Sequence, residues 1–251
     1  YAEATWSQQW NLNYEQPASD TAVGAYSVSR YLVTVGQYRA FLDAENGYAS
    51  ARWWDGLAVP LPAPELPRAA GRMSDHATEV SWYDALAFCR WASACLGEVV
   101  RLPTEVEWEF AARGPSGVER RVFPWGDVYD DRRANGLDSG IGRPTPVGLY
   151  PVADGAWGND SPLDLSGNVW EWCSTIHSTE YGHEFLYPYN AEDGRESLDA
   201  DDSHRRVVRG GSFTNQAFLL RTTMRGHDRP SLRAARQGFR VVKGVRRSDG
   251  S

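Results

Sequence analysis

The spacing of apolar residues predicts three helices in the first half of the chain. Each begins at a residue whose side chain can cap a helix N-terminus, and these residues are Thr34, Ser81 and Thr104. Ser81 and Thr104 are followed three positions later by an acid, which is the pattern of a capping box. The sequence supplies a stop after each segment, at Asn46-Gly47, Gly97 and Gly114.

The second predicted helix is apolar on two sides. One face carries Trp82, Leu86, Cys89 and Leu96, and another carries Phe88, Trp91 and Cys95. We therefore expect this helix to lie at the centre of the fold. The three cysteines, Cys89, Cys95 and Cys173, form no CxxC pair. We expect all three to be small buried apolar residues, and nothing about them demands an oxidising compartment.

Strand signals in the sequence are short and few. Apolar runs predict strands at residues 25–29, 99–102, 207–208 and 239–242. Residues 115–206 show no periodicity and consist of short motifs rich in Gly, Pro, Asp, Asn and Trp. We expect this stretch to be loop, held together by bound ions or by stacked aromatic side chains.

Length, charge and hydropathy limit the classes of partner. The 251 residues are enough for one large domain, and we expect a single domain over residues 1–251 that belongs to a longer chain. A net charge of −7 argues against a nucleic-acid partner. No run of about eighteen apolar residues occurs, so we expect no membrane partner. We expect a monomeric domain, and the lack of a signal-peptide pattern favours the cytoplasm.

The motif LDLSGNVWEW at residues 163–172 carries candidate metal chemistry. Asp164 and Glu171 supply carboxylates, and the turn between them can direct carbonyl oxygens inward. Mixed side-chain and backbone oxygens suit Ca²⁺, which takes about six to eight oxygen ligands. The alternative is a turn in which Asp164 and Asn168 accept hydrogen bonds from backbone amides. The residues alone leave both interpretations open.

The last quarter of the chain, residues 207–242, is rich in arginine. It contains Arg209, Arg221, Arg225, Arg229, Arg233, Arg236 and Arg240 against one acid, Asp228. These arginines could form an anion-binding face, but with 33 acids in the chain we expect several to pair internally. The apolar run 218–220 in so polar a segment suggests that one of its residues is exposed to a partner.

Several motifs occur along the chain in a family-specific order. They include RLPTEVEWEFAARG, FPWGD, LSGNVWEW, VVRGGSF and GFRVV. In this combination, from about residue 23 to 242, the chain resembles the formylglycine-generating enzyme (sulfatase-modifying factor) family. The resemblance implies an α+β, C-type-lectin-like fold with two main helices, small antiparallel sheets and extensive loops. It also implies that the N- and C-terminal strands meet in one sheet.

The resemblance also implies structural Ca²⁺. The family's ligand pattern falls on the side chains of Asp164 and Glu171 and on the carbonyl groups of Gly167 and Val169. A second family site would begin at Asn135 and Gly136.

The family's copper chemistry does not carry over to this chain. In the active enzymes two cysteines follow the RGGS motif, three and eight positions after its serine, and hold copper. Here those positions are Asn215 and Leu220, and no cysteine follows Cys173. We therefore expect no copper and no formylglycine synthesis of the family type. Relatives that act on histidine derivatives use a separate iron-binding helical domain with three histidines, for which these residues offer no counterpart.

We therefore expect a non-catalytic recognition domain that displays a binding surface from residues 213–237. The ligand is an unspecified protein or small molecule, and the architecture is similar to that of the variable proteins of diversity-generating retroelements. The predicted face consists of Phe213, Thr214, Gln216, Phe218, Leu219, Thr222, Met224, His227, Asp228, Leu232 and Arg236. The alternative is an enzyme of the same family with a non-standard active site, in which Arg225, His227 and Asp228 act as acids or bases.

Overall fold

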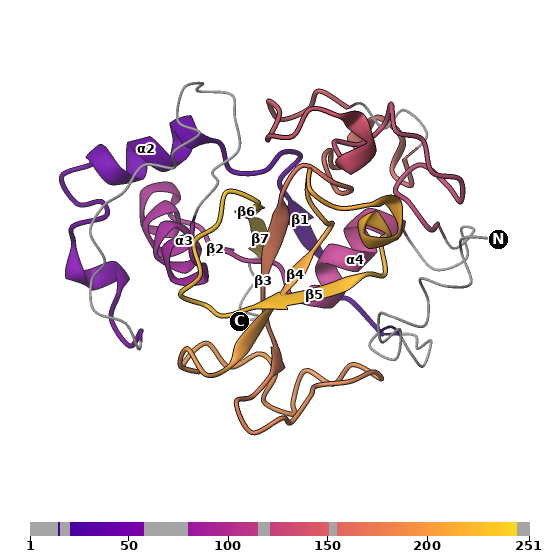
Figure 1. The fold of residues 1–251 in the computed structure, drawn as a ribbon. Coiled ribbons are helices and arrows are strands. Elements are labelled where there is room, and N and C mark those ends of the chain that lie inside the picture. The colour runs from indigo at the N-terminus through magenta and orange to yellow at the C-terminus, as the bar shows by residue number, and fades with distance from the viewer. Residues whose placement is uncertain (1–14, 16–20, 58–79, 115–120, 151–154, 245–251) are drawn as a thin grey trace, which may run out of the picture.

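The computed structural model describes residue 15 and residues 21–57, 80–114, 121–150 and 155–244 (Figure 1). Three α-helices occur in these ranges: α2 (Val35–Asp43), α3 (Trp82–Leu96) and α4 (Glu105–Arg113). Each begins with a capping box, in which Thr34, Ser81 or Thr104 accepts a backbone N–H three residues ahead at 3.2, 3.1 and 3.3 Å respectively. The three predicted helices are confirmed, one more than the two main helices that the resemblance implied.

Helix α3 is central, but its last turn leaves the core. Trp82, Leu86 and Cys89 are buried, whereas Leu96 is 65% exposed and Cys95 is exposed. The expectation that Cys95 is buried is therefore wrong. The helix runs one turn beyond the core before Gly97, in the left-handed conformation, ends it.

The described strands form two sheets. They are β1 (Tyr26–Val28), β2 (Val100–Arg101), β3 (Trp170–Ser178), β4 (Arg205–Arg209), β5 (Arg225–Asp228), β6 (Gln237–Gly238) and β7 (Val242–Gly244). The first sheet has the order β1-β7-β2 and is antiparallel, so the N- and C-terminal strands meet as expected. The second has the order β5-β4-β3-β6, and its β3–β6 pair is parallel. The sheets are thus small and antiparallel as expected, except for the short β3–β6 pair.

Two strand predictions fail for physical reasons. The nine-residue β3 lies inside residues 115–206, where only loop was expected. It is buried on both faces except at Ser174, so it lacks the alternation that marks a half-buried strand. Residues 239–241 are not in a strand, because the chain crosses there from one sheet to the other. The Phe239 carbonyl accepts the Val33 N–H at 2.9 Å during that crossing.

The core joins α3 to β3 through large aromatic side chains. The Trp82 indole donates to the Cys173 carbonyl at 2.9 Å, and the Trp172 indole donates to the Val80 carbonyl at 3.0 Å. Figure 1 shows α2 and α3 on one side of the strands and α4 on the other. The remaining regular elements are single 3₁₀ turns at η2 (Ala51–Trp53), η3 (Leu137–Ser139), η4 (Gly158–Asp160) and η5 (Ala217–Leu220). No helix in the described part of the chain is both long and apolar enough to cross a membrane.

Ending the chain before Gly238 should abolish cooperative folding. This truncation removes the buried Phe239 and also β7, the central strand between β1 and β2. A chain that ends after Gly244 keeps all described strands and serves as the control. Circular dichroism melts of the two proteins make the comparison, and a soluble shorter chain with a cooperative melt would contradict the prediction.

Candidate binding site

A buried ion network joins α4 to β4 and β5. The Glu105 carboxylate accepts hydrogen bonds from Nε of Arg225 and, at 2.8 Å, from Nη2 of the same residue. Nη2 of Arg209 pairs with the Glu109 carboxylate, and Nε of Arg209 lies 3.9 Å from Glu105 Oε1. The side chains of Glu105, Arg209 and Arg225 are 0% exposed. The two carboxylates thus compensate two buried guanidinium groups, and the partly exposed Arg113 also pairs with Glu109 at 2.6 Å.

The same network positions the backbone that leads into β5. Nη1 of Arg209 donates to the carbonyl groups of Thr223 and Met224 at 2.7 and 2.8 Å. Burial alone would raise the pKa of Glu109, but the guanidinium groups of Arg209 and Arg113 hold it below its usual value. Glu109 is therefore ionised and keeps Arg209 in place.

Most of the arginines in the last quarter pair with acids from earlier in the chain, as expected. Besides the network, the pairs are Arg240–Glu171 at 2.6 Å, Arg233–Asp84 at 2.8 Å and Arg221–Glu15 at 2.6 Å. Arg229 and Arg236 are exposed. The arginines of this segment therefore do not form a continuous anion-binding face.

The eleven residues predicted to display a ligand-binding face are unequally accessible. Exposed side chains belong to Thr214, Gln216 and Arg236. Half-buried ones belong to Phe218, Met224, His227, Asp228 and Leu232. The buried ones are Phe213, Leu219 and Thr222.

The three buried residues attach the segment to the fold. Phe213 and Leu219 are 9% and 8% exposed, so their apolar side chains are part of the interior. Thr222 donates its hydroxyl to the Arg121 carbonyl at 2.7 Å and its N–H to the Val122 carbonyl at 2.8 Å. Including these residues in an exposed face was therefore incorrect. In the run 218–220, Phe218 is partly exposed and the two leucines are buried.

A polar cluster remains at the end of β5, and we call Arg205, Asp228, Arg236 and Gln237 the Asp228 cluster. Asp228 Oδ2 accepts the Gln237 side-chain amide at 2.6 Å. Gln237 is 0% exposed, and its Oε1 has no hydrogen-bond partner among the described residues. Burial raises the pKa of Asp228, while the nearby charges of Arg236 and Arg205 oppose the rise. Sequence analysis missed Gln237, because a glutamine between Arg236 and a glycine gives no signal of burial.

The loop that carries Arg236 is anchored at both ends. Ser231 donates its N–H and its hydroxyl to the Asp202 carboxylate at 2.7 and 2.8 Å. Arg233 makes two hydrogen bonds of 2.8 Å to the Asp84 carboxylate at the start of α3. The Arg236 carbonyl accepts the N–H of Trp170 at 2.7 Å. The cluster therefore lies on a rigid support, as a binding site requires.

The side chains of the three residues predicted as alternative acids or bases do not face a common position. Arg225 is buried against Glu105. His227 and Asp228 are neighbours in β5, so their side chains point to opposite faces of the strand. His227 Nδ1 lies 3.3 Å from Arg205 Nη1, and burial lowers its pKa. This geometry gives no acid–base pair.

The loop predicted to bind Ca²⁺ contains the hydrogen bonds of the alternative turn. Asp164 Oδ2 accepts the Gly148 N–H at 2.7 Å, and Asn168 Oδ1 accepts the Thr145 N–H at 2.9 Å. Asp164 and Asn168 have φ values of 61° and 69°, and both belong to a tight buried turn with Gly167 and Val169. The turn interpretation and the calcium interpretation thus share the same residues.

The donor set suits Ca²⁺ at Asp164 better than at Glu171. The Glu171 carboxylate already accepts hydrogen bonds from Arg240 at 2.6 and 2.8 Å and from the Trp108 indole at 2.7 Å. Arg240 therefore neutralises its charge. Burial raises the pKa of Asp164 to about 6, so a cation would stabilise its ionised form. The described residues contain no group of three or more His, Cys, Asp or Glu placed to hold a metal.

The second predicted calcium position is a hydrogen-bonded turn. The Asn135 side chain donates to the Arg143 carbonyl at 2.8 Å, and the Gly136 carbonyl accepts the Ser139 hydroxyl at 2.8 Å. These groups stabilise the turn η3 through contacts within the chain.

The positions expected to hold cysteine in copper-dependent relatives have structural roles here. Asn215 Oδ1 accepts the N–H and the hydroxyl of Ser212 at 3.0 and 2.7 Å. Leu220 is 0% exposed and packs with Phe123 and Ala134. An amide and a buried alkyl group offer no thiolate for copper.

Comparison with known proteins agrees with this architecture. The model of the sulfatase-modifying factor enzyme 1-like domain matches residues 3–245. The chain belongs to this family. Treponema denticola variable protein 1 shares the fold of this sulfatase-modifying-factor-like domain, with a TM-score of 0.68 and 18% identity over 93% of this chain and 90% of that one.

Two kinds of enzyme are among the relatives of this sulfatase-modifying-factor-like domain. Hercynine oxygenase of Mycobacterium tuberculosis is 34% identical over 252 residues, which are 92% of this chain and 56% of that protein. Formylglycine-generating enzyme of Streptomyces coelicolor is 31% identical over 231 residues, which are 83% of this chain and 66% of that protein. The domain thus spans little more than half the length of the hercynine oxygenases it matches.

Replacing Glu105 with Gln should destabilise the domain by about 3–5 kcal/mol, because Arg225 would keep a buried charge without its carboxylate partner. Glu98→Gln is the control, since Glu98 and Lys243 pair at the surface with 40% and 49% of their side chains exposed. That change should cost less than about 1 kcal/mol. Urea unfolding measures both, and equal losses would contradict the role assigned to the network.

Proposed function

We propose that this sulfatase-modifying-factor-like domain is a recognition domain whose ligand binds at the Asp228 cluster, and that it performs no chemistry by itself. The observation that carries the proposal is the contact between Asp228 and the buried Gln237. It holds the half-buried Asp228 carboxylate, a hydrogen-bond acceptor, in place on a rigid strand end. The proposed surface is narrower than residues 213–237 and consists of β5, β6 and the anchored loop between them.

The charges of the cluster indicate the kind of ligand. A half-buried carboxylate suits a group with N–H donors, such as an ammonium or an imidazole. Arg205 and Arg236 are exposed next to it and can pair with a carboxylate. A small molecule or peptide end that carries both kinds of group complements this arrangement.

A second candidate is the ligand-binding part of an enzyme that acts on hercynine. The 34% identity to hercynine oxygenase over 92% of this chain favours it. In this case the Asp228 cluster would bind the histidine derivative, and residues outside this domain would supply the reactive centre. Both candidates require a ligand at Asp228, and they differ in whether turnover follows.

Hercynine should raise the melting temperature of the domain, and Asp228→Asn should weaken its binding about tenfold or more. The substitution keeps the shape but removes the charge that a cationic or N–H-rich ligand needs, and such bonds contribute about 1.5–3 kcal/mol. Thermal-shift titrations measure the effect. The exposed Asp199→Asn provides a control with the same change of net charge.

If hercynine does not raise the melting temperature, a library of amino acids and short peptides is screened in the same assay. Ligands that stabilise both variants equally would contradict binding at the Asp228 cluster. Turnover by the purified domain with added metal and a thiol, abolished by Asp228→Ala, would refute a binding-only role and support the second candidate.

We also propose that Ca²⁺ binds at the loop of Asp164, with Asp164 as its charged ligand and the carbonyl groups of Gly167 and Val169 beside it. The buried carboxylate of Asp164 supports this assignment. Glu171 contributes less, because Arg240 holds both of its oxygens. Asn135 and Gly136 remain a second predicted position.

Chelation should lower the melting temperature if Ca²⁺ stabilises the native state, by about 2–4 °C for each kcal/mol of binding energy lost. Asp164→Asn should melt at the same temperature with and without chelator, because it lacks the charged ligand. Asp199→Asn should keep the response of the native sequence. Metal-free native protein that melts unchanged when calcium is added would contradict the calcium proposal.

A further inference from the structure

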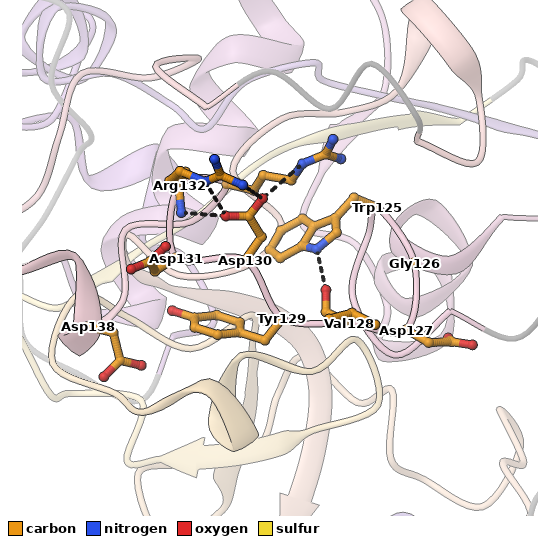
Figure 2. Close-up of a pocket in the computed structure, with 10 residues that line it drawn as sticks. Trp125, Gly126, Asp127, Val128, Tyr129, Asp130, Asp131, Arg132 and Asp138 are labelled. Atoms are coloured by element: carbon orange, nitrogen blue, oxygen red, sulfur yellow. Dashed lines mark hydrogen bonds and ion pairs between the residues drawn. The ribbon is translucent and has the colours of Figure 1, made fainter.

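A hollow of about 930 Å³ on the surface is lined by residues 125–133 and Asp138 (Figure 2). Asp130 in its wall pairs with Arg132 at 2.9 Å, so part of its charge is neutralised within the chain. This open hollow does not indicate a particular ligand. The interior offers a sharper feature, because basic side chains from β3, β4 and β5 gather at one place in the sheet.

Two histidines from different strands are in contact there. His177 lies in β3 and is 1% exposed, and His227 lies in β5 and is half-buried. Their ring centroids are 4.3 Å apart, with 47° between the ring planes. Neutral imidazoles tolerate this separation, whereas two imidazolium ions so close together would repel each other.

Arginines add positive charge beside the two rings. Nη1 of Arg205 lies 3.3 Å from Nδ1 of His227. Because a guanidinium group can only donate, this contact requires an unprotonated Nδ1, which a neutral imidazole supplies. Arg225 also acts on both rings, and its own charge is paired with Glu105. The acid that acts on His227 from the loop after β3 is the exposed Glu184.

These surroundings oppose protonation of both rings. Burial lowers the pKa of His177 to about 2, and the charges of Arg225, His227 and Arg205 add to this effect. Burial and the charge of Arg205 also lower the pKa of His227, while Glu184 opposes them. When exposed to water, both rings would titrate near the ordinary histidine pKa of about 6.5. Below that pH an opened chain therefore takes up protons that the closed chain does not, and the closed chain loses stability.

The chain after β3 folds back over His177, and we call residues 179–186 the covering segment. Phe185 is its one buried residue. The Phe185 N–H donates to the His177 carbonyl at 2.9 Å, and the Phe185 carbonyl accepts Nη2 of Arg225 at 3.1 Å. In Figure 1 the connection from β3 to β4 projects below the strands. A segment with so little buried surface opens at a lower free energy than the core does.

We propose that His177 and His227 form an acid-sensitive contact: as the pH falls, protonation of the two rings releases the covering segment from β3 and from the end of β5. A second imidazolium ion would repel the first, and a protonated Nδ1 of His227 could no longer accept from Arg205. Asp228 follows His227 in β5, so this opening would also disturb the Asp228 cluster. That consequence rests on the proposed function, whereas the opening itself does not.

The test uses the ligand-free domain at about pH 7 and about pH 5, on either side of the ordinary histidine pKa. Hydrogen exchange measures the protection of the Phe185 amide, corrected for the intrinsic exchange rate. We expect this protection to fall about tenfold or more at the lower pH, because each histidine contributes up to about tenfold per pH unit. Amides of α3 report unfolding of the core and should stay better protected than Phe185. Protection of Phe185 that does not fall, or that equals the protection of α3 at the lower pH, would overturn the proposal.

Variants separate the histidine pair from other groups that titrate in this range. A buried carboxyl with a raised pKa, such as Asp164, acts in the opposite direction because the native state binds its proton more tightly. His177→Gln/His227→Gln should abolish the fall in Phe185 protection. The control is His183→Gln, which removes an exposed histidine of the covering segment and should keep the native response.

Arg205→Gln provides a second test that leaves the buried residues unchanged. Arg205 is exposed, so the variant should fold, and the change removes one charge that opposes protonation of His227. The pKa of His227, measured by NMR titration of its imidazole signals, should rise, and the fall in Phe185 protection should become smaller. A double histidine variant with the native pH response, or an Arg205→Gln variant in which the pKa of His227 is unchanged, would contradict the acid-sensitive contact.

Discussion

The buried pairing of Arg209 and Arg225 with Glu105 and Glu109 is the interaction on which the rest of the structure depends. It joins helix α4 to strands β4 and β5, and the side chains of Glu105, Arg209 and Arg225 in it are 0% exposed. Because the two charges of each sign balance, no single member can be lost without leaving a buried charge. Two further arginines form ion pairs with acids from earlier in the chain: Arg240 with Glu171 in β3, and Arg233 with Asp84 at the start of α3. A C-terminal segment with little regular structure is thereby fixed to the body of the domain by charge.

This constraint divides residues 213–237 into an internal and an external part. Phe213, Leu219, Leu220 and Thr222 fill or brace the interior. Thr214, Gln216 and the loop that follows β5 reach the surface. Asp228 lies there, supported by Gln237 and flanked by arginines. The domain thus has the scaffold of its family, and the ligand site that we propose for it lies on this same segment.

Sequence reasoning succeeded where the determining interactions are local. Thr34, Ser81 and Thr104 cap helices because their side chains reach an amide only three residues away. It failed for β3, because a strand buried on both faces has no alternating pattern. It also placed a strand at residues 239–242, where three of the four residues form a crossover between sheets. Gln237 could not be recognised as a site residue, because its burial arises from pairing with β3.

The sequence by itself determined the family, the helix starts, the absence of any cysteine after Cys173 and the surplus of acids that the C-terminal arginines would meet. These properties depend on residue identity and on spacing over a few positions. Only the tertiary structure decided which acid pairs with which arginine and which of residues 213–237 are exposed. Such outcomes depend on contacts between residues far apart in the chain, and these contacts exist only once the sheets and helices have packed together.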